Sequence, residues 1–293
     1  MEQLIRSRGL NGEQRAQIFA LELECAACEP LCMKLNRDML ENRDPDIVND
    51  FFYEYDGKTA GFLGLYGFGA KPKEIELTGM VRPEFRRQKI FSKLFEAAAQ
   101  ECRSRGAERL LLISERRSGS GTGFALHAGL TLAFSESRMC CARYTATHLT
   151  SQRVTLRHAS ESDLPQIVEL DGLCFGRSAE PEDFLQLPED NIFIAEFGGR
   201  MIGKIGLSAE GGQGYIFGFG VIPEYRGRGL GREMLSKTLE KYFAGGGTSV
   251  ILETGIDNAR AQSLYTSCGF REITVYDYYE ADCRQPNGEG PRL

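Results

Sequence analysis

The chain has 293 residues, of which 42% are hydrophobic and 26% charged, and its formal net charge is −6 at pH 7. This length suits two domains of ordinary size. The acidic balance argues against a nucleic-acid binder that works by neutralising phosphates, and no run of 18 apolar residues indicates a membrane span. The first residues lack the apolar core of a signal peptide, so we expect a cytoplasmic location.

The first half alternates helical and extended patterns. Its expected elements are a helix over Glu13–Cys32, a short helix over Arg37–Glu41, a hairpin of Phe51–Tyr55 and Thr59–Tyr66, a strand over Glu74–Val81, a helix over Arg86–Arg105 and a strand over Arg109–Ser114.

Three cysteines near the start, Cys25, Cys28 and Cys32, have a spacing that could ligate a metal. They also recur at i, i+3 and i+7 on the first helical segment, where they would form one packed face, and no fourth ligand is near in sequence. The chain has nine cysteines, an odd number without a regular framework, which favours reduced thiols over disulfides. We therefore expect packed thiols and no metal.

The second half repeats the order of the first. Its expected elements are a strand over Val154–Arg157, an amphipathic helix that follows Ser160–Asp163 and runs through Cys174, a short helix over Pro181–Leu187, a hairpin of Ile192–Phe197 and Met201–Ser208, and strands over Tyr215–Val221 and Ser249–Thr254.

The two halves align at a constant offset of 140 residues. Val81-x-Pro83-Glu84-Phe85-Arg86 matches Val221-x-Pro223-Glu224-Tyr225-Arg226, and Gly129 matches Gly269. This agreement indicates a tandem duplication. The expected domains are 1–148 and 152–282, and 283–293 is an expected disordered tail.

A glycine-rich loop, Val221 to Gly231, joins the apolar strand Tyr215–Val221 to a helical pattern. The first turn of a helix leaves its N–H groups without partners, and glycines let an anion approach the backbone. Arg226, Arg228 and Arg232 add positive charge. A flexible solvated connection has a similar composition, but the spacing Arg-x-x-Gly-x-Gly is more specific. It is neither the Walker loop nor the dinucleotide fingerprint.

This spacing resembles the acetyl-CoA pyrophosphate loop of the GNAT N-acetyltransferase family, with Arg226, Gly229 and Gly231 at its three defined places. The segment Asn258 to Phe270 resembles the family's second block, Asn-x-x-Ala-x-x-Leu-Tyr-x-x-x-Gly-Phe. The resemblance implies an α+β fold with two tandem acyl-CoA N-acyltransferase domains, each a mostly antiparallel, twisted mixed sheet flanked by helices. The second copy is similar to ribosomal-protein alanine acetyltransferases.

The resemblance also implies a site in the second copy for acetyl-CoA as co-substrate, without a metal. The backbone of Phe219, Gly220 and Val221 would pair with the pantetheine arm, and Asn258 would bind the same region. The pyrophosphate would lie against Arg226 and the backbone of Gly227, Arg228, Gly229, Leu230, Gly231 and Arg232.

Two residues are candidates for catalysis. Tyr265 would donate a proton to the departing thiolate, and Glu253 would act as the base. The alternatives are a tyrosine that only packs in the core and a glutamate that is only solvated at a strand end. In the first copy Ala125 replaces Tyr265, while Lys89 and Phe91 replace the loop glycines. We expect that copy to be degenerate and to serve packing, the walls of the substrate groove or homodimer formation.

The expected function is transfer of an acetyl group from acetyl-CoA to a primary amine by direct attack in a ternary complex. The acceptor would be a peptide or protein N-terminus or a small amine, with no nucleic-acid or membrane partner. The alternative is a silent acyl-CoA-binding sensor or scaffold, although a pure binder has no use for the proton donor Tyr265.

Overall fold

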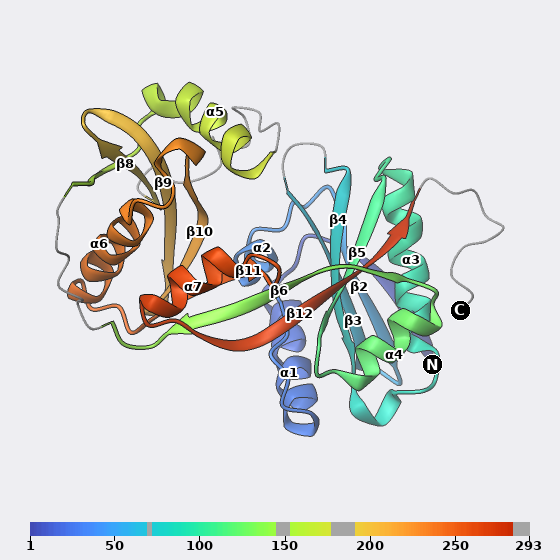
Figure 1. Cartoon of the computed structure of the whole chain (residues 1–293). Coiled ribbons are helices and arrows are strands. Elements are labelled where there is room, and N and C mark those ends of the chain that lie inside the picture. Colours follow the sequence, from blue (N-terminus) through green and yellow to red (C-terminus); the bar gives the residue numbers. More distant parts are fainter. Residues whose placement is uncertain (69–71, 145–152, 177–190, 284–293) are drawn as a thin grey trace. The chain divides into compact units, whose positions relative to one another are not determined.

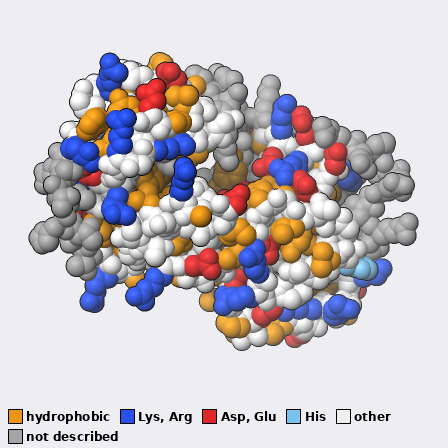
Figure 2. All heavy atoms as spheres, viewed as in Figure 1, with side chains coloured by type: hydrophobic (Ala, Val, Ile, Leu, Met, Phe, Trp, Pro, Cys, Tyr) orange, Lys and Arg blue, Asp and Glu red, His pale blue; other side chains and the backbone are white. Residues whose placement is uncertain are grey.

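The computed structural model describes residues 1–68, 72–144, 153–176 and 191–283 (Figure 1). The chain forms two compact units, one made of Met1–Ser135 with Thr274–Leu293 and the other of Glu136–Ile273. Among the described residues, no helix is long and apolar enough to cross a membrane. Basic and acidic side chains are mixed over the face shown in Figure 2.

The first unit is a mixed sheet with helices. Its elements are β1 (Glu2–Arg8), α1 (Gly12–Cys28), α2 (Arg37–Glu41), β2 (Val48–Tyr55), β3 (Lys58–Gly67), β4 (Glu74–Val81), α3 (Ile90–Ser104), β5 (Arg109–Glu115), α4 (Gly119–His127) and the start of β6 (Thr131–Cys141). The strand order is β1-β2-β3-β4-β5-β12, where β12 is Arg271–Asp282. Neighbouring strands are antiparallel, except that β4 and β5 are parallel.

The second unit repeats this plan. Its elements are β7 (Thr155–His158), α5 (Leu164–Phe175), β8 (Ile192–Phe197), β9 (Arg200–Glu210), β10 (Gln213–Val221), α6 (Leu230–Ala244), β11 (Ser249–Gly255) and α7 (Ala259–Ser267). The strand order is β6-β11-β10-β9-β8-β7, and here the parallel pair is β10 with β11. The α+β fold class and the tandem duplication are confirmed.

The 140-residue offset seen in the sequence holds for the elements themselves. Helices α3 and α6, strands β5 and β11, and helices α4 and α7 begin and end at positions that differ by this offset. The short 3₁₀ turns Pro83–Phe85 and Pro223–Tyr225 obey the same rule. Each functional position in one unit therefore has a defined counterpart in the other.

The two halves of the sequence exchange their last strands. In the first unit, Tyr276–Asp282 of β12 pairs with Glu115–Arg109 of β5. In the second unit, Glu136–Cys141 of β6 pairs with Gly255–Val250 of β11. The compact units thus differ from the expected division into 1–148 and 152–282, because each strand pairs beyond its own repeat.

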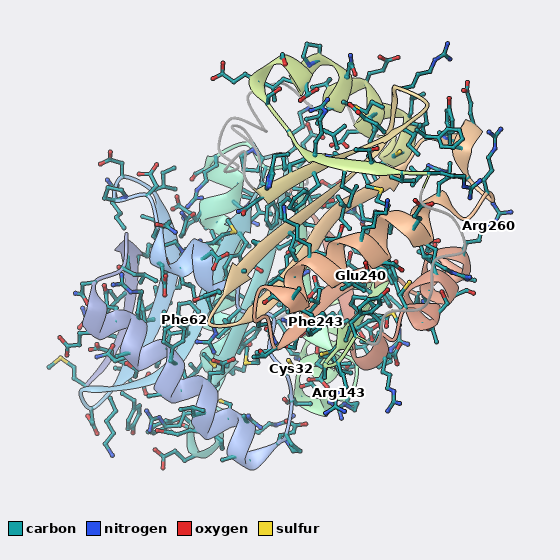
Figure 3. All side chains as sticks on the ribbon, turned by 90° about the vertical axis from the view of Figure 1, so that its left-hand side faces the viewer. Cys32, Phe62, Arg143, Glu240, Phe243 and Arg260 are labelled. Atoms are coloured by element: carbon teal, nitrogen blue, oxygen red, sulfur yellow. The ribbon has the colours of Figure 1, made fainter. Side chains whose placement is uncertain are left out.

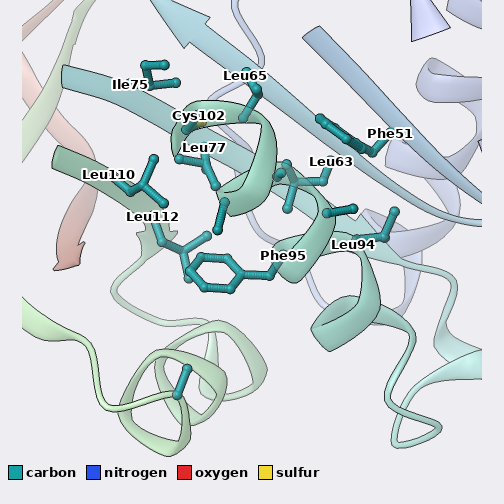
Figure 4. Packing of buried hydrophobic residues seen from close by; sticks show 14 of the residues in the cluster. Phe51, Leu63, Leu65, Ile75, Leu77, Leu94, Phe95, Cys102, Leu110 and Leu112 are labelled. Atoms are coloured by element: carbon teal, nitrogen blue, oxygen red, sulfur yellow. The ribbon is translucent and has the colours of Figure 1, made fainter. Parts of the chain in front are cut away.

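The core of the first unit lies between α3 and the sheet, as Figure 4 shows. Residues Leu94, Phe95 and Cys102 of α3 recur at helical spacing and face Leu63, Leu77 and Leu112 of the strands. In the second unit, Leu230, Met234, Leu235 and Leu239 of α6 give the equivalent stripe, and all are at most 1% exposed. This packing fixes the position of each helix start relative to the end of its neighbouring strand.

Two expected helix boundaries were wrong. Helix α1 ends at Cys28 rather than Cys32, because Glu29 precedes Pro30 and adopts an extended conformation. Cys32, labelled in Figure 3, therefore lies after the helix, and the three cysteines do not share one face: Cys25 is buried while Cys28 is exposed. Helix α3 begins at Ile90 rather than Arg86, because the turn before it holds residues in the left-handed region.

Two further differences concern the ends of the chain. The sequence pattern missed β1, which pairs with β2 from Glu2 opposite Tyr55. Cys283, expected in the tail, is buried, and its N–H donates to the carbonyl of Glu108 at 3.0 Å. The expected helix Pro181–Leu187 and residues 284–293 lie outside the described residues.

Candidate active site

The site begins where two parallel strands stop pairing. Strands β10 and β11 pair from Gln213 opposite Ser249 to Ile216 opposite Leu252, and the pairing ends there. On its other side β10 continues, with Gly220 opposite Lys204 and Val221 opposite Gly203 of β9. One edge of Phe219, Gly220 and Val221 therefore has no partner among the described strands, as the expected pairing with an extended ligand requires.

A β-bulge changes the direction of the end of β10. The register with β9 shifts between Phe217 and Gly220, and Gly218 lies in the left-handed region at φ +53°. Beside it, Lys204 forms a buried ion pair with Asp171 of α5 at 2.8 Å. The glycines within Tyr215–Val221 are the sequence signal for this bulge, which the prediction of a regular strand did not include. In the first unit β3 and β4 pair without such a shift.

The glycine-rich loop has the conformation that its composition predicts. Gly227 and Gly229 have φ of +76° and +78°, which glycine adopts without strain. Arg226 folds back, and its Nε donates to the carbonyl of Val221 at 2.7 Å, so this side chain fixes the loop to the strand end. The Arg228 guanidinium lies over the Tyr225 ring, 5.3 Å from its centroid.

Helix α6 offers free N–H groups to an anion. Its first backbone bond runs from the Glu233 N–H to the carbonyl of Gly229 at 3.1 Å, which leaves the N–H groups of Leu230, Gly231 and Arg232 without intrahelical partners. The Leu230 side chain is buried and anchors the helix start. A methyl group added at Gly229 would meet no described atom closer than 3.9 Å. The residues present therefore fit a phosphate-bearing ligand at this turn.

Tyr265 is held by aromatic packing on α7. Its ring centroid lies 6.1 Å from that of Phe219 and 5.9 Å from that of Phe270, and the residue is 7% exposed. Burial raises the pKa of the phenol to about 12, so it is protonated at neutral pH. The ring packs in the core, and its role as proton donor remains a prediction.

Asn258 caps helix α7. Its side-chain oxygen accepts a hydrogen bond from the N–H of Ala261 at 3.1 Å. Ser118 does the same for α4 by accepting from the N–H of Gly121. Asn258 therefore stabilises the start of α7, and its contact with the coenzyme remains a prediction.

Glu253 lies on β11, just beyond the last residue that pairs with β10, in a small polar cluster. Its side chain is 7% exposed and therefore not freely solvated. The Tyr215 hydroxyl donates to Oε2 at 3.4 Å, and Nη1 of Arg138 lies 4.0 Å from Oε1. Burial, together with the negative charge of Glu253, raises the pKa of the Tyr215 phenol well above its usual range.

Arg138 reaches this cluster on the exchanged strand β6, where it is the register partner of Glu253. The sequence motifs did not point to it, because it belongs to the first repeat. Tyr276 and Tyr278 lie on β12, the strand that the second repeat contributes to the first unit. They are buried in the first unit and pack with Leu111 and Ile113, so they form core there.

The arrangement is a mixed sheet whose parallel strands separate before a turn that leads into a helix, and it occurs twice in one chain; only the second copy has glycines in that turn. Solved structures share this fold over nearly the whole chain. A GCN5-related N-acetyltransferase from Sphaerobacter thermophilus matches with a TM-score of 0.82 and 18% identity over 96% of each chain. A tandem GNAT protein from the clavulanic acid biosynthesis pathway matches with a TM-score of 0.75 and 15% identity, over 98% of this chain and all of its own.

The model of the acetyltransferase (GNAT) family matches this chain twice, at residues 16–119 and 163–270, and the chain belongs to that family. Curated relatives match less than half of this chain. The N-alpha-acetyltransferase RimI of Mycobacterium tuberculosis is 33% identical over 44% of this chain and 85% of its own. An uncharacterized N-acetyltransferase of Methanocaldococcus jannaschii is 29% identical over 47% and 96%.

Proposed function

We propose that the second unit transfers an acetyl group from acetyl-CoA to a primary amine by direct attack in a ternary complex. The observation that carries this proposal is the loop at the start of α6, with two left-handed glycines and three free N–H groups at the open end of β10. The named activities of the relatives, which are N-acetyltransferases, support it.

The coenzyme would be held by backbone groups. The N–H groups of Leu230, Gly231 and Arg232 and the helix dipole face the diphosphate, and the Arg232 side chain adds positive charge. The free edge of Phe219–Val221 pairs with the amide groups of the pantetheine arm in the manner of an added strand. This mode of binding favours glycine at position 229, since it depends on close approach of the diphosphate to the backbone.

Catalysis would rest on two side chains. Glu253 accepts a proton from the acceptor ammonium, directly or through water, and the free amine then attacks the thioester carbonyl carbon. As the carbon–sulfur bond breaks, Tyr265, whose buried phenol is protonated at neutral pH, donates its proton to the sulfur. The proton that the attacking nitrogen loses as the amide forms then returns to the Tyr265 phenolate through water. Tyr215 and Arg138 hold the Glu253 carboxylate in place.

The cost of deprotonating the acceptor favours an α-amine. An amine with a pKa near 8 costs about 1.4 kcal/mol to deprotonate at pH 7, whereas a lysine side chain costs about 4.6 kcal/mol. A single carboxylate without a second base suits the lower cost. The relatives named N-alpha-acetyltransferase agree with this choice. We therefore propose a peptide or protein N-terminus as acceptor, with a small amine of low pKa as the second choice.

Release of free thiol from acetyl-CoA tests the proposal. The full chain is incubated with peptides that differ in their first residue, with a lysine peptide blocked at its N-terminus, and with polyamines. We expect turnover with a free α-amine. Tyr265→Phe and Glu253→Gln should each lower turnover by about 10²-fold or more. Acetyl-CoA affinity should be unchanged, since a phenylalanine ring keeps the packing of the tyrosine and glutamine keeps the shape of the glutamate.

Tyr242→Phe is the matched control. This tyrosine of α6 belongs to the same unit and donates its hydroxyl to the carbonyl of Gly212, at the opposite end of the helix from the loop. It should lose some stability and no turnover. If acetyl-CoA binds but no amine in the panel is acetylated, or if Tyr265→Phe reacts as fast as the parent, the chain is a sensor or scaffold and the catalytic proposal fails.

A further inference from the structure

The first unit contains a large cavity that the proposed function does not use. Its volume is about 740 Å³, within the range of small-molecule sites. It lies where β4 and β5 stop pairing after Leu77 opposite Leu112, the counterpart of the opening between β10 and β11. Every residue that lines it belongs to the first unit. The apolar part of the lining includes Met80, Phe85, Ile90, Phe91, Leu112 and Phe124.

One polar side chain on the cavity wall is buried without a partner. Thr78 follows the last paired residue of β4 and is 2% exposed. Its hydroxyl oxygen has no hydrogen-bond partner in the described part of the chain. A buried hydroxyl is nearly always satisfied in a native protein, so this one calls for a bound water or a polar group of a ligand.

The mouth of the cavity carries two cations in a strained turn. Arg87 and Lys89 have φ of +65° and +59°, where the second unit has glycines, and both side chains are exposed on the cavity lining. Their neighbours Arg82 and Arg86 are paired with glutamates of α1 and the residue after it. Within the described residues, Arg87 and Lys89 themselves take part in no ion pair.

The strain has a physical consequence. Non-glycine residues persist in this region of the backbone only where the surroundings hold them there, and such residues gather at ligand sites. The turn keeps the shape of its glycine-containing counterpart and also leads into a 15-residue helix, α3, whose first N–H groups are free. Two side-chain charges are thereby added to a turn that already favours an anion.

The same positions disfavour a second coenzyme A. Phe91 stands where the second unit has Gly231, and its ring packs edge-on against Phe124 at 4.6 Å, so aromatic surface lies beside the first turn of the helix. The space beside that turn is therefore apolar, and the side chains of Arg87 and Lys89 stand where a diphosphate would approach the backbone. Ala125 and Ile113 occupy the counterpart positions of Tyr265 and Glu253, so neither candidate catalytic group is present.

We propose that this cavity binds an amphiphile with one compact anionic head, a phosphate or a carboxylate. The head lies at Arg87 and Lys89, and the apolar body runs along Phe91 and Met80 toward Thr78. The first unit is then a binding module with its own ligand class. This function is independent of acetyl transfer in the second unit.

Calorimetry on the full chain tests the proposal with decyl phosphate and decanoate, which also distinguishes the two head groups. We expect at least one of them to bind with one site per chain. Inorganic phosphate alone, decanol and decyltrimethylammonium should each bind at least tenfold more weakly, because each lacks the tail, the charge or its sign.

The decisive variant is Arg87→Gly/Lys89→Gly. Glycine relieves the left-handed strain, so this protein should fold at least as well as the parent, and its affinity for the anionic amphiphile should fall at least tenfold. Lys58→Ala, which removes an exposed charge at the first residue of β3 in the same unit, is the matched control and should bind like the parent. Equal binding of decanol, equal binding by the double glycine variant, or two coenzyme A sites per parent chain would each overturn the proposal.

Discussion

Adding a methyl group at Gly229, just before α6, tests whether the loop binds the coenzyme. The cost of backbone strain is measured separately, as a loss of folding stability. Gly229→Ala places an L-residue at φ +78°, which costs about 1 kcal/mol of folding free energy. No steric cost adds to this, because the nearest described atom would be 3.9 Å away. The first unit shows that the turn tolerates side chains, since Lys89 holds the equivalent position. We expect a fall in melting temperature of about 3 °C.

The same methyl group should weaken acetyl-CoA binding. It stands at the residue before the free N–H groups, where a diphosphate must approach the backbone, and we expect a loss in affinity of about tenfold, or about 1.4 kcal/mol. Calorimetric titration with acetyl-CoA, together with thermal unfolding of the same samples, measures both quantities.

Gly246→Ala is the matched control at the other end of α6. Gly246 has φ +93° and no described atom within 4 Å of an added methyl group, so its strain is similar. It should lose comparable stability and bind acetyl-CoA like the parent. If the two variants bind acetyl-CoA equally well, the loop does not hold the diphosphate, and the proposed site is refuted.

Two further predictions concern charges in the second unit. Asp163 accepts two 2.7 Å hydrogen bonds from Arg157, which together with bonds from Ser160 lower its pKa. Its contribution to stability is therefore present above the unfolded pKa and lost as the pH falls through the folded pKa. Asp163→Asn should lower the free energy of unfolding by about 2 kcal/mol at pH 7, measured by chemical denaturation. A difference in unfolding free energy between variant and parent that does not become smaller in acid would contradict this. Arg138→Gln removes the cation that lies 4.0 Å from Glu253 and that we propose holds its carboxylate in place, so turnover should fall while acetyl-CoA affinity stays the same; unchanged turnover would show that Arg138 does not position Glu253.

Local patterns predicted most of the fold, because short-range rules govern them. The strand Glu74–Val81 was predicted to the residue, and the matching motifs foretold the 140-residue offset of the later elements. The start of α3 could not be predicted. Arg87 and Lys89 adopt left-handed conformations that their residue types disfavour, and only the surrounding fold imposes them.

The strand exchange was hidden for a different reason. Strands β6 and β12 have the same alternation whichever half they pair with, and pairing partners leave no mark in a single sequence. Arg138 was missed as a consequence, since it lies far in sequence from Glu253. The loop glycines, by contrast, were predictable, because positive φ values select glycine directly.

The exchanged strands β6 and β12 make each repeat depend on the other for its last strand. A substitution in residues 136–141 alters the sheet next to Glu253, the proposed catalytic carboxylate. These residues nevertheless belong to the first repeat, which has no carboxylate at the counterpart position of Glu253. A substitution in the last strand of one repeat therefore changes the packing of the sheet of the other repeat. If the two halves are expressed separately, each has an unpaired sheet edge where the last strand of the other half belongs. Mixing the two polypeptides should then give a stable complex, although neither half folds stably alone.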